Sequence, residues 1–300
     1  MPPLLLNQPA QAAAQQDSIV PLLRNIASLG ARLEQLPKPA VDAAMRLLST
    51  RLPADRPLGA DVLKSAVERA GILASPAKAT TAASDVKTSL LQLRAGLLAM
   101  LDGGEIAPVA PIARRPPPPL RETQPRGMRA DGPTLPGDAP PRDAARTLLH
   151  QTDAALSRLK LTQVASQPPD AARAAAVAPD FMVELPMLLG AELALLQLKV
   201  QRDGKDRATR TNVRGWRVRF AVNFTAIGEV GAQVALLGRT TNVTVWADRA
   251  ATADALEAML PELAPALAAR GLTVGSVRLR RGVPDDDTPP PSGRLMDTLT

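Results

Sequence analysis

The spacing of hydrophobic residues divides the chain into a helical first part and a strand-rich last part. After Ser18, apolar residues recur at steps of three and four, which is the period of an amphipathic helix. The period predicts helices at 18–36, Ala40–Arg51, Ala60–Ala70 and Ser84–Leu101, with Met45 and Val62 among the inward residues. We expect residues 18–102 to form a small helical unit, in which Gly71 ends the third helix.

Other segments have no apolar period and are rich in proline, alanine or glutamine. They are residues 1–17, 103–141, 167–179 and 284–300. Segments with so few large apolar residues cannot bury enough surface to fold by themselves. We therefore expect the two terminal segments to be disordered and the two internal ones to be linkers, with polyproline II character at Pro116–Pro119. Between the two linkers, residues 142–166 return to the helical period and predict one more helix.

From Phe181 the period changes to two, the period of a β-strand. The clearest strand is RGWRVRFAVNF, where one set of residues is apolar (Trp216, Val218, Phe220, Val222 and Phe224) and the alternate set is polar (Arg217, Arg219 and Asn223). This alternation predicts a sheet with one packed face and one solvated face. A break of phase at Leu195–Leu196 indicates a β-bulge, and GRTTN predicts a hairpin turn.

Residues 180–283 thus hold five or six strands, one helix and all five aromatic residues. The expected fold class is α+β. It consists of a C-terminal domain with an antiparallel or mixed sheet and one covering helix, preceded by an all-α N-terminal unit and disordered proline-rich linkers. The best-formed core is expected in the C-terminal domain.

The helix of this domain contains two prolines. In ALEAMLPELAPALAARG an inner face is formed by Leu256, Met259, Leu260, Leu263 and Leu267. A proline inside a helix removes an amide donor and costs about 3 kcal/mol. Either a first helix ends at Leu260 and a second begins at Pro261, where proline is tolerated, or one helix kinks at this point. We expect a break or a kink rather than a straight helix through Pro261 and Pro265.

The chain is basic, with a net charge of +7 and a pI near 10.5. Such a balance suggests a nucleic acid or an anionic surface as a partner. The arginines are scattered, however, and few aromatic residues stand among them to stack on bases. An excess of arginine over lysine, with much alanine and proline, is also what a GC-rich coding sequence produces. Nucleic acid is therefore not expected as a partner.

The side chains that usually carry chemistry are scarce. The sequence has no cysteine, no tyrosine and one histidine, which excludes disulfides and cysteine-ligated metals. It contains no phosphate-binding G-x-x-x-x-G-K-[ST], no G-x-S-x-G and no H-E-x-x-H pattern. We predict no catalytic, cofactor-binding or metal site and interpret the protein as a non-enzyme. No apolar run is long enough to span a membrane, and the N-terminus is unlike a secretory signal.

Residues 227–279 resemble the C-terminal domain of bacterial flagellar hook-length control proteins. The resemblance begins at Ile227-Gly228-Glu229-Val230 and continues through two alternating strands to the helix motif Leu260-Pro261-Glu262-Leu263, then Leu267 and Gly271-Leu272. Ile227 stands where the family has leucine, and Pro265 lies near a position that is often basic in the family. The motif residues, which are possible partner contacts, are Ile227, Gly228, Val230, Leu260, Pro261, Leu263, Leu267, Gly271 and Leu272.

The resemblance implies a cytoplasmic protein that is exported through the flagellar type III apparatus and controls hook length. It implies that the C-terminal domain contacts the export gate and switches the exported substrates from hook to filament proteins. The implied partners are the export gate and hook or hook-cap proteins. The alternative hypothesis is a basic nucleic-acid-binding protein, or a general adaptor, without catalysis.

Overall fold

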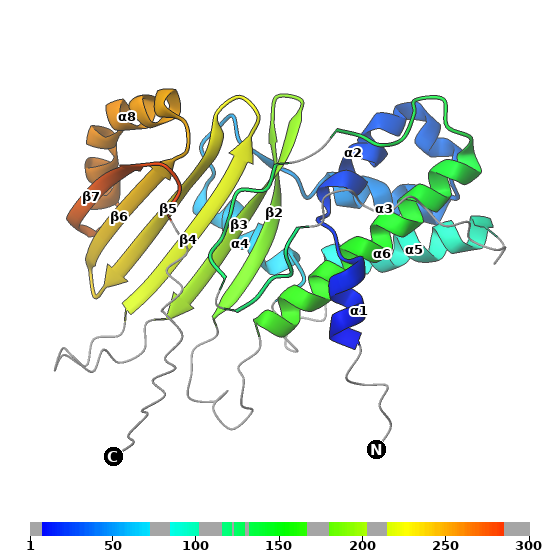
Figure 1. Cartoon of the computed structure of the whole chain (residues 1–300), viewed down its shortest axis with the longest axis horizontal. Coiled ribbons are helices and arrows are strands. Elements are labelled where there is room, and N and C mark those ends of the chain that lie inside the picture. The colour runs from blue at the N-terminus through cyan, green and yellow to red at the C-terminus, as the bar shows by residue number, and fades with distance from the viewer. Residues whose placement is uncertain are drawn as a thin grey trace, which may run out of the picture.

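The computed structural model describes residues 8–72, 85–101, 116–121, 123–129, 132–166, 180–202 and 215–284. Its architecture is α+β, as the sequence predicts. One mixed seven-stranded sheet has the order β1-β2-β3-β4-β5-β6-β7 (Figure 1). Most of the helices lie beyond the β2 side of the sheet, and α8 (Ala250–Ala269) lies at the β7 end.

Five strands form an antiparallel meander, because each of the last four pairs antiparallel with the strand before it in the sequence. They are β2 (Phe181–Leu189), β3 (Glu192–Arg202), β4 (Gly215–Phe224), β5 (Gly228–Leu237) and β6 (Thr240–Ala247). The predicted hairpin turn is confirmed: Gly238 and Arg239 join β5 to β6, and Gly238 has a φ of 61°, which glycine adopts without strain. β7 (Thr273–Arg281) is parallel to β6, so α8 serves as the crossover connection.

The helices at the β2 side share a hydrophobic core with the sheet. The core is built by α2 (Val20–Leu29), the 3-10 helix η2 (Gly30–Gln35), α3 (Lys38–Leu48), α5 (Val86–Leu101) and α6 (Pro141–Ala165). Leu193 and Leu195 of β3 belong to the same cluster. The large side chains Leu22, Leu23, Leu93 and Leu148 are completely buried in it.

A second core lies on the opposite face of the sheet. There α4 (Ala60–Arg69) contributes Ala66, which clusters with Val183 and Phe224 of the sheet. The two-residue strand β1 (Leu52–Pro53), between α3 and α4, extends the sheet beside β2. The described residues of this part, 18–72 and 85–101, thus contain helices at the predicted places, but these helices do not form a unit of their own, because their apolar sides are buried against α6 and the sheet.

Some predictions for the first part of the chain are wrong in burial or in secondary structure. The helical period predicts Met45 and Val62 on inner sides, but their side chains are 55% and 46% exposed. Residues 1–17 are predicted to be disordered, yet α1 (Gln8–Gln15) occupies much of this segment and packs on α6. Its alanine and glutamine residues favour a helix intrinsically, and α6 supplies the packing surface that the segment lacks. Residues 1–7 lie outside the described part of the chain.

Strand β3 is buried on both faces in its first half, which explains its irregular hydrophobic pattern. Leu195 packs in the helical core and Leu196 in the core with α4, although they are neighbours in sequence. The pairing of β2 with β3 runs without a shift of register, so the bulge predicted at these residues is wrong. A register shift occurs instead between Thr241 and Asn242 of β6, where β7 pairs.

The proline-rich segment predicted as a linker lies across the sheet. We call residues 116–121 and 123–129 the strap. Lys199 of β3 is only 3% exposed, and its Nζ donates to the carbonyl oxygens of Arg121 (2.6 Å) and Thr123 (3.1 Å). The backbone N–H of Arg126 donates to Gln197 Oε1 at 3.0 Å. A buried ammonium group needs acceptors, so the strap is a bound part of the fold.

The segment after the strap is also packed. Leu135 and Ala139 are buried in the helical core, and Asn25 Oδ1 accepts the backbone N–H groups of Thr134 (2.8 Å) and Leu135 (3.1 Å). The prediction of a disordered linker is therefore wrong for 116–121, 123–129 and 132–140. The predictions for 103–115, 167–179 and 285–300 fall on residues outside the described part.

A buried ion pair joins α6 to the sheet beneath the strap. The Arg158 side chain is 4% exposed and donates to both carboxylate oxygens of Glu184, at 2.7 and 2.6 Å. Arg158 also donates to Gln16 Oε1 and to the Pro117 carbonyl oxygen at 3.2 Å. Gln197 Nε2 donates to Glu184 Oε1 at 3.0 Å. Residues from α6, β2, β3, the strap and the segment after α1 thus meet at one pair.

We call the sheet face under the strap the polar face; its outer half, from β4 to β7, bears Arg219, Gln233, Thr244, Trp246 and Arg280. The sheet register places Trp246 opposite Gly231, and a Cβ atom at Gly231 would lie 2.4 Å from the indole ring and 2.7 Å from the Phe220 carbonyl oxygen. We expect Gly231→Val to lower the free energy of unfolding by about 3 kcal/mol through overpacking. Ala235→Val, on the same strand and face, should cost less than about 1 kcal/mol. Urea unfolding measures both, and equal losses would contradict this role of Gly231.

Candidate interaction surface

One helix carries both prolines of the LPELAP stretch. α8 continues from Ala250 to Ala269 with Pro261 and Pro265 inside it, so of the two alternatives, a break or a kink, the break into two helices is wrong. The prolines stand four residues apart on the exposed side. The carbonyl groups that lose an intrahelical donor belong to Glu257 and Pro261, which are also exposed, so water can bond to them. Solvation on the outer side makes the two prolines tolerable.

The inner side of α8 packs on β7 and β6. The predicted inner residues Leu256, Leu260, Leu263 and Leu267 are half-buried, whereas Met259 is 59% exposed, so its assignment to the inner face is wrong. The outer side is almost free of charge after Glu257, where Glu262 is the one carboxylate before Arg270. Its exposed residues are mostly small or apolar: Ala250, Ala251, Ala255, Ala258, Met259, Pro261, Pro265, Ala266, Ala268 and Ala269. Contiguous exposed apolar surface is typical of protein contact sites.

The turn before β5 is fixed between β3 and the start of α8. Gly228 has a φ of 78°, and a Cβ atom there would lie 2.1 Å from Asp248 Oδ1. Thr252 Oγ1 donates to the carbonyl oxygen of Ile227 at 2.7 Å, which ties the turn to the first turn of α8. On the other side, Glu192 Oε1 accepts the N–H and Oγ1–H of Thr225, both at 2.7 Å.

The charge of Glu192 is stabilised in this turn. Burial by itself raises the pKa of Glu192, but the two hydrogen bonds from Thr225 and the positive charges of Arg24 and Arg129 outweigh burial and lower the pKa below its usual range. Glu192 therefore holds the turn in its ionised form.

The other end of α8 is fixed by Gly271 and by β7. Gly271 has a φ of 77°, and the N–H of Leu272 donates back to the carbonyl oxygen of Leu267 at 3.2 Å, as in a glycine-terminated helix. Arg281, at the end of β7, donates to Asp254 at 2.7 Å and Glu257 at 3.0 Å. The hydrogen bond to Asp254 and the charges of both carboxylates raise the pKa of Arg281 above its usual value.

The structure places the nine motif residues in the turn before β5, at the start of β5, in α8 and in the turn after α8. Gly228 and Gly271 set backbone turns, and Leu260, Leu263 and Leu267 attach α8 to the sheet. Of the nine, Pro261 and Gly271 are exposed. Most of the motif therefore shapes and positions the outer side of α8, and that side includes Met259 and Ala266, which the motif does not contain.

Sequence reasoning missed the strap, the Arg158–Glu184 pair and the polar-face pocket described below. Arg217 and Arg219, the basis of the nucleic-acid hypothesis, are half-buried on the polar face, and Arg219 donates to Gln233. Within the described residues no group of three His, Cys, Asp or Glu side chains could hold a metal ion. No helix in the same part of the chain is long and apolar enough to cross a membrane.

Residues 204–288 match the model of a known family, described as flagellar hook-length control protein FliK. This match confirms the resemblance to the hook-length control family. The matched range contains β4, β5, β6, α8 and β7 and all nine motif residues, whereas β2 and β3 precede it. No curated protein and no solved structure is significantly similar to this chain. The hook-length control match thus covers strands β4 to β7 and the helix α8 that packs on β6 and β7.

Proposed function

We propose that the protein controls the length of the flagellar hook. The C-terminal domain would do so by contacting the flagellar export gate, which then switches its substrates from hook to filament proteins. The match of residues 204–288 to the hook-length control family is the observation that carries this proposal. The protein itself would leave the cytoplasm through the type III apparatus and meet hook or hook-cap proteins on that route.

The role proposed is one of contact, without catalysis. Several polar groups on and near α8 are engaged in structural bonds: Thr252 with Ile227, Arg239 with the Gly271 carbonyl oxygen, and Arg281 with Asp254 and Glu257. What this end of the domain offers to a partner is the apolar outer side of α8. An exposed apolar helix is suited to docking in a groove of another protein.

A double substitution on this surface tests the proposal. Met259→Glu with Ala266→Glu places two charges seven residues apart on the outer side of α8, where both residues are exposed. Exposed substitutions of this kind change stability by less than about 0.5 kcal/mol, so the domain should remain folded. We expect the variant strain to grow long hooks without filaments, as measured by electron microscopy of isolated hooks.

The matched control replaces two exposed apolar residues outside the matched range, Leu91→Glu with Val62→Glu. This control should leave hook length unchanged. Normal hooks and filaments in the α8 variant, with the protein present at its usual level, would contradict the proposed contact.

A further inference from the structure

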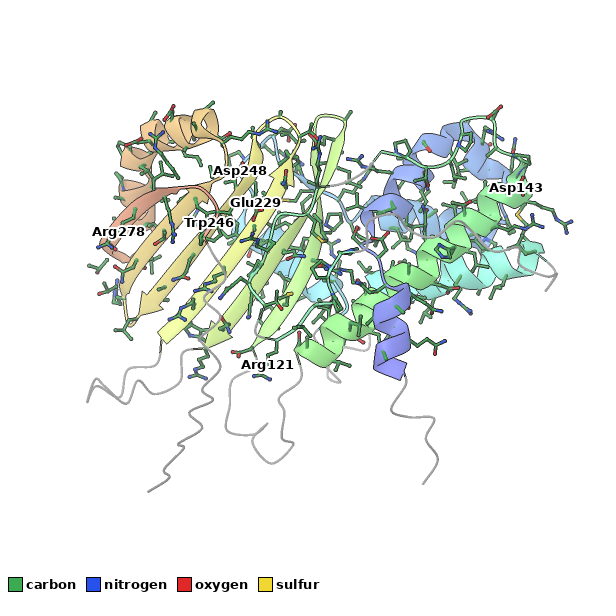
Figure 2. The ribbon with its side chains drawn as sticks, in the orientation of Figure 1. Arg121, Asp143, Glu229, Trp246, Asp248 and Arg278 are labelled. Carbon is green, nitrogen blue, oxygen red and sulfur yellow. The ribbon has the colours of Figure 1, made fainter. Side chains whose placement is uncertain are left out.

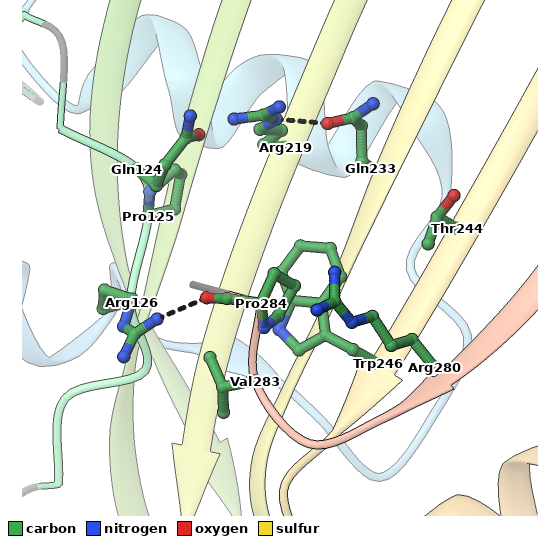
Figure 3. A pocket seen from close by; sticks show the side chains of 10 residues that line it. All are labelled: Gln124, Pro125, Arg126, Arg219, Gln233, Thr244, Trp246, Arg280, Val283 and Pro284. Carbon is green, nitrogen blue, oxygen red and sulfur yellow. Dashed lines mark hydrogen bonds between the residues drawn. The ribbon is translucent and has the colours of Figure 1, made fainter. Parts of the chain in front are cut away.

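The outer half of the polar face contains a pocket with three arginines and a tryptophan. Its volume is about 140 Å³. The walls come from β4 (Arg219), β5 (Gln233), β6 (Thr244 and Trp246) and β7 (Arg280), and the rim from the strap and from residues 283–284 after β7 (Figure 3). Segments far apart in sequence thus converge on one hollow that lies away from the outer side of α8.

Cross-strand register explains why the hollow exists. Arg219, Gln233 and Thr244 are paired across β4, β5 and β6 in one row. In the neighbouring row, Ala221, Gly231, Trp246 and Arg280 follow one another. The small residues Ala221 and Gly231 leave room for the indole, which lies against Gly231. The tryptophan ring and the two arginines at either side, Arg219 and Arg280, therefore line one depression.

A hydrogen bond links the two parts of the rim. Arg126 Nη1 of the strap donates to the Pro284 carbonyl oxygen at 2.9 Å, which links the strap to the segment after β7. The contact uses one arm of the guanidinium group, and the side chain is exposed. Arg126 thus adds a positive charge to the mouth of the pocket.

The polar lining is rich in donors and contains no carboxylate. Arg126, Arg219 and Arg280 line the pocket, and the Arg280 side chain has no hydrogen bond or ion pair with any other described residue. Trp246 is 6% exposed, and its Nε1–H is buried without an acceptor in the described part. An indole N–H can only donate, and a buried donor without a partner is unfavourable. Glu229, on the same face of β5 as Gln233, does not line the pocket.

We propose that this pocket binds an oxyanion, either inorganic phosphate or a carboxylate of an acidic peptide. Guanidinium groups bind both in the same way, through charge-assisted hydrogen bonds to paired oxygens. An oxygen beside the indole would accept the Trp246 N–H. The volume is below the range of about 300–1,000 Å³ for pockets that enclose drug-sized ligands, so a small anionic group enters rather than a whole nucleotide. The inference is independent of the proposed contact through α8.

Trp246 provides the measurement. In a Trp216→Phe background it is the one tryptophan of the full chain, so its fluorescence reports on the pocket. The protein is titrated at low salt with sodium phosphate and, separately, with a glutamate-containing hexapeptide, because salt screens such contacts. Sodium chloride at the same ionic strength is the blank. We expect a saturable change with at least one probe.

Substitution of two arginines on β7, one inside and one outside the pocket, distinguishes binding at the pocket from general attraction of anions to a basic surface. Arg280 lines the pocket, whereas Arg278 lies two residues away on the same strand and face and outside the lining (Figure 2 shows Arg278 and Trp246). Arg280→Ala should weaken binding by about tenfold or more, and Arg278→Ala by less than about twofold. Arg219→Gln provides a second pocket variant in case Arg280→Ala unfolds, and circular dichroism monitors folding.

The two titrations also show which of the two oxyanions, free phosphate or a peptide carboxylate, the pocket prefers. Tighter binding of the hexapeptide identifies a peptide carboxylate as the ligand, and tighter binding of phosphate identifies the free ion. Asp285, Asp286 and Asp287 follow Pro284 in the sequence, so a variant with asparagine at all three is titrated in parallel to exclude competition from within the chain. The proposal would be overturned if neither probe gave a saturable change with the native chain or with the triple-asparagine variant. It would also be overturned if Arg278→Ala and Arg280→Ala weakened binding equally.

Discussion

Replacing Arg158 by alanine is expected to lower the free energy of unfolding by about 3–5 kcal/mol. The substitution leaves the Glu184 carboxylate, whose side chain is 12% exposed, without its cation. It also removes the donor to Gln16 and to the Pro117 carbonyl oxygen. A buried charge without a partner costs more than the pair contributed, and a few kcal/mol is a large share of the stability of a domain.

The Arg94–Asp153 pair provides the matched control. It also joins two elements, α5 and α6, with a distance of 2.6 Å, but its side chains are 43% and 47% exposed. Exposed pairs contribute about 0–1 kcal/mol, so Arg94→Ala should change little. Urea unfolding followed by circular dichroism gives both values. Equal small losses for the two variants would show that the Arg158 pair does not hold the helices to the sheet.

A double variant separates charge from packing at the same place. Arg158→Met with Glu184→Leu removes both charges and keeps apolar volume, and replacement of buried pairs in this way is often neutral or stabilising. We expect this variant to recover most of the stability that Arg158→Ala loses. A loss as large as that of Arg158→Ala would mean that the bonds to Gln16, Pro117 and Gln197 matter more than the unpaired charge.

Local patterns were sufficient where a segment packs on one side. The alternation in β4, the glycine turn between β5 and β6, and the helical period of α2 and α5 each appear in the structure at the predicted places. These elements have one buried side and one exposed or polar side, so their period is visible in the sequence. The resemblance over residues 227–279 likewise rests on turns and a helix that are local in sequence.

Predictions from local patterns were wrong where a segment is held by contacts with parts of the chain distant in sequence. Leu195 and Leu196 look like a broken alternation, but both faces of β3 are covered there, by α2 and α6 on one side and α4 on the other. The strap looks like a linker, because its bonds to Lys199 and Gln197 are made by backbone groups that any sequence possesses. Gly127 was the one available signal: a Cβ atom there would lie 2.8 Å from the Val222 backbone, but a glycine in a proline-rich stretch is read as a turn residue.

The largest functional effect is expected from removing the C-terminal domain. Ending the chain at residue 179 removes β2 to β7 and α8, and with them the whole range that matches the hook-length control family. It retains α1 to α6 and the strap. If the matched domain carries the switch from hook to filament substrates, the shortened chain cannot stop hook growth, however well its first part is exported.

The shortened chain also loses the sheet against which α2 and α6 pack. Its amount in the cell and in the culture medium must therefore be measured beside hook length, so that loss of the protein is distinguished from loss of the switch. The full-length Met259→Glu/Ala266→Glu variant complements this comparison, because it keeps every core contact.

Hook length in a strain without the gene, complemented by the full chain or by residues 1–179, tests the central claim most directly. Electron microscopy of isolated hooks gives the length distribution. The proposed function predicts a narrow distribution and filaments with the full chain, and long hooks without filaments with residues 1–179 at an equal protein level. Normal hooks and filaments in the strain that carries residues 1–179 would contradict it.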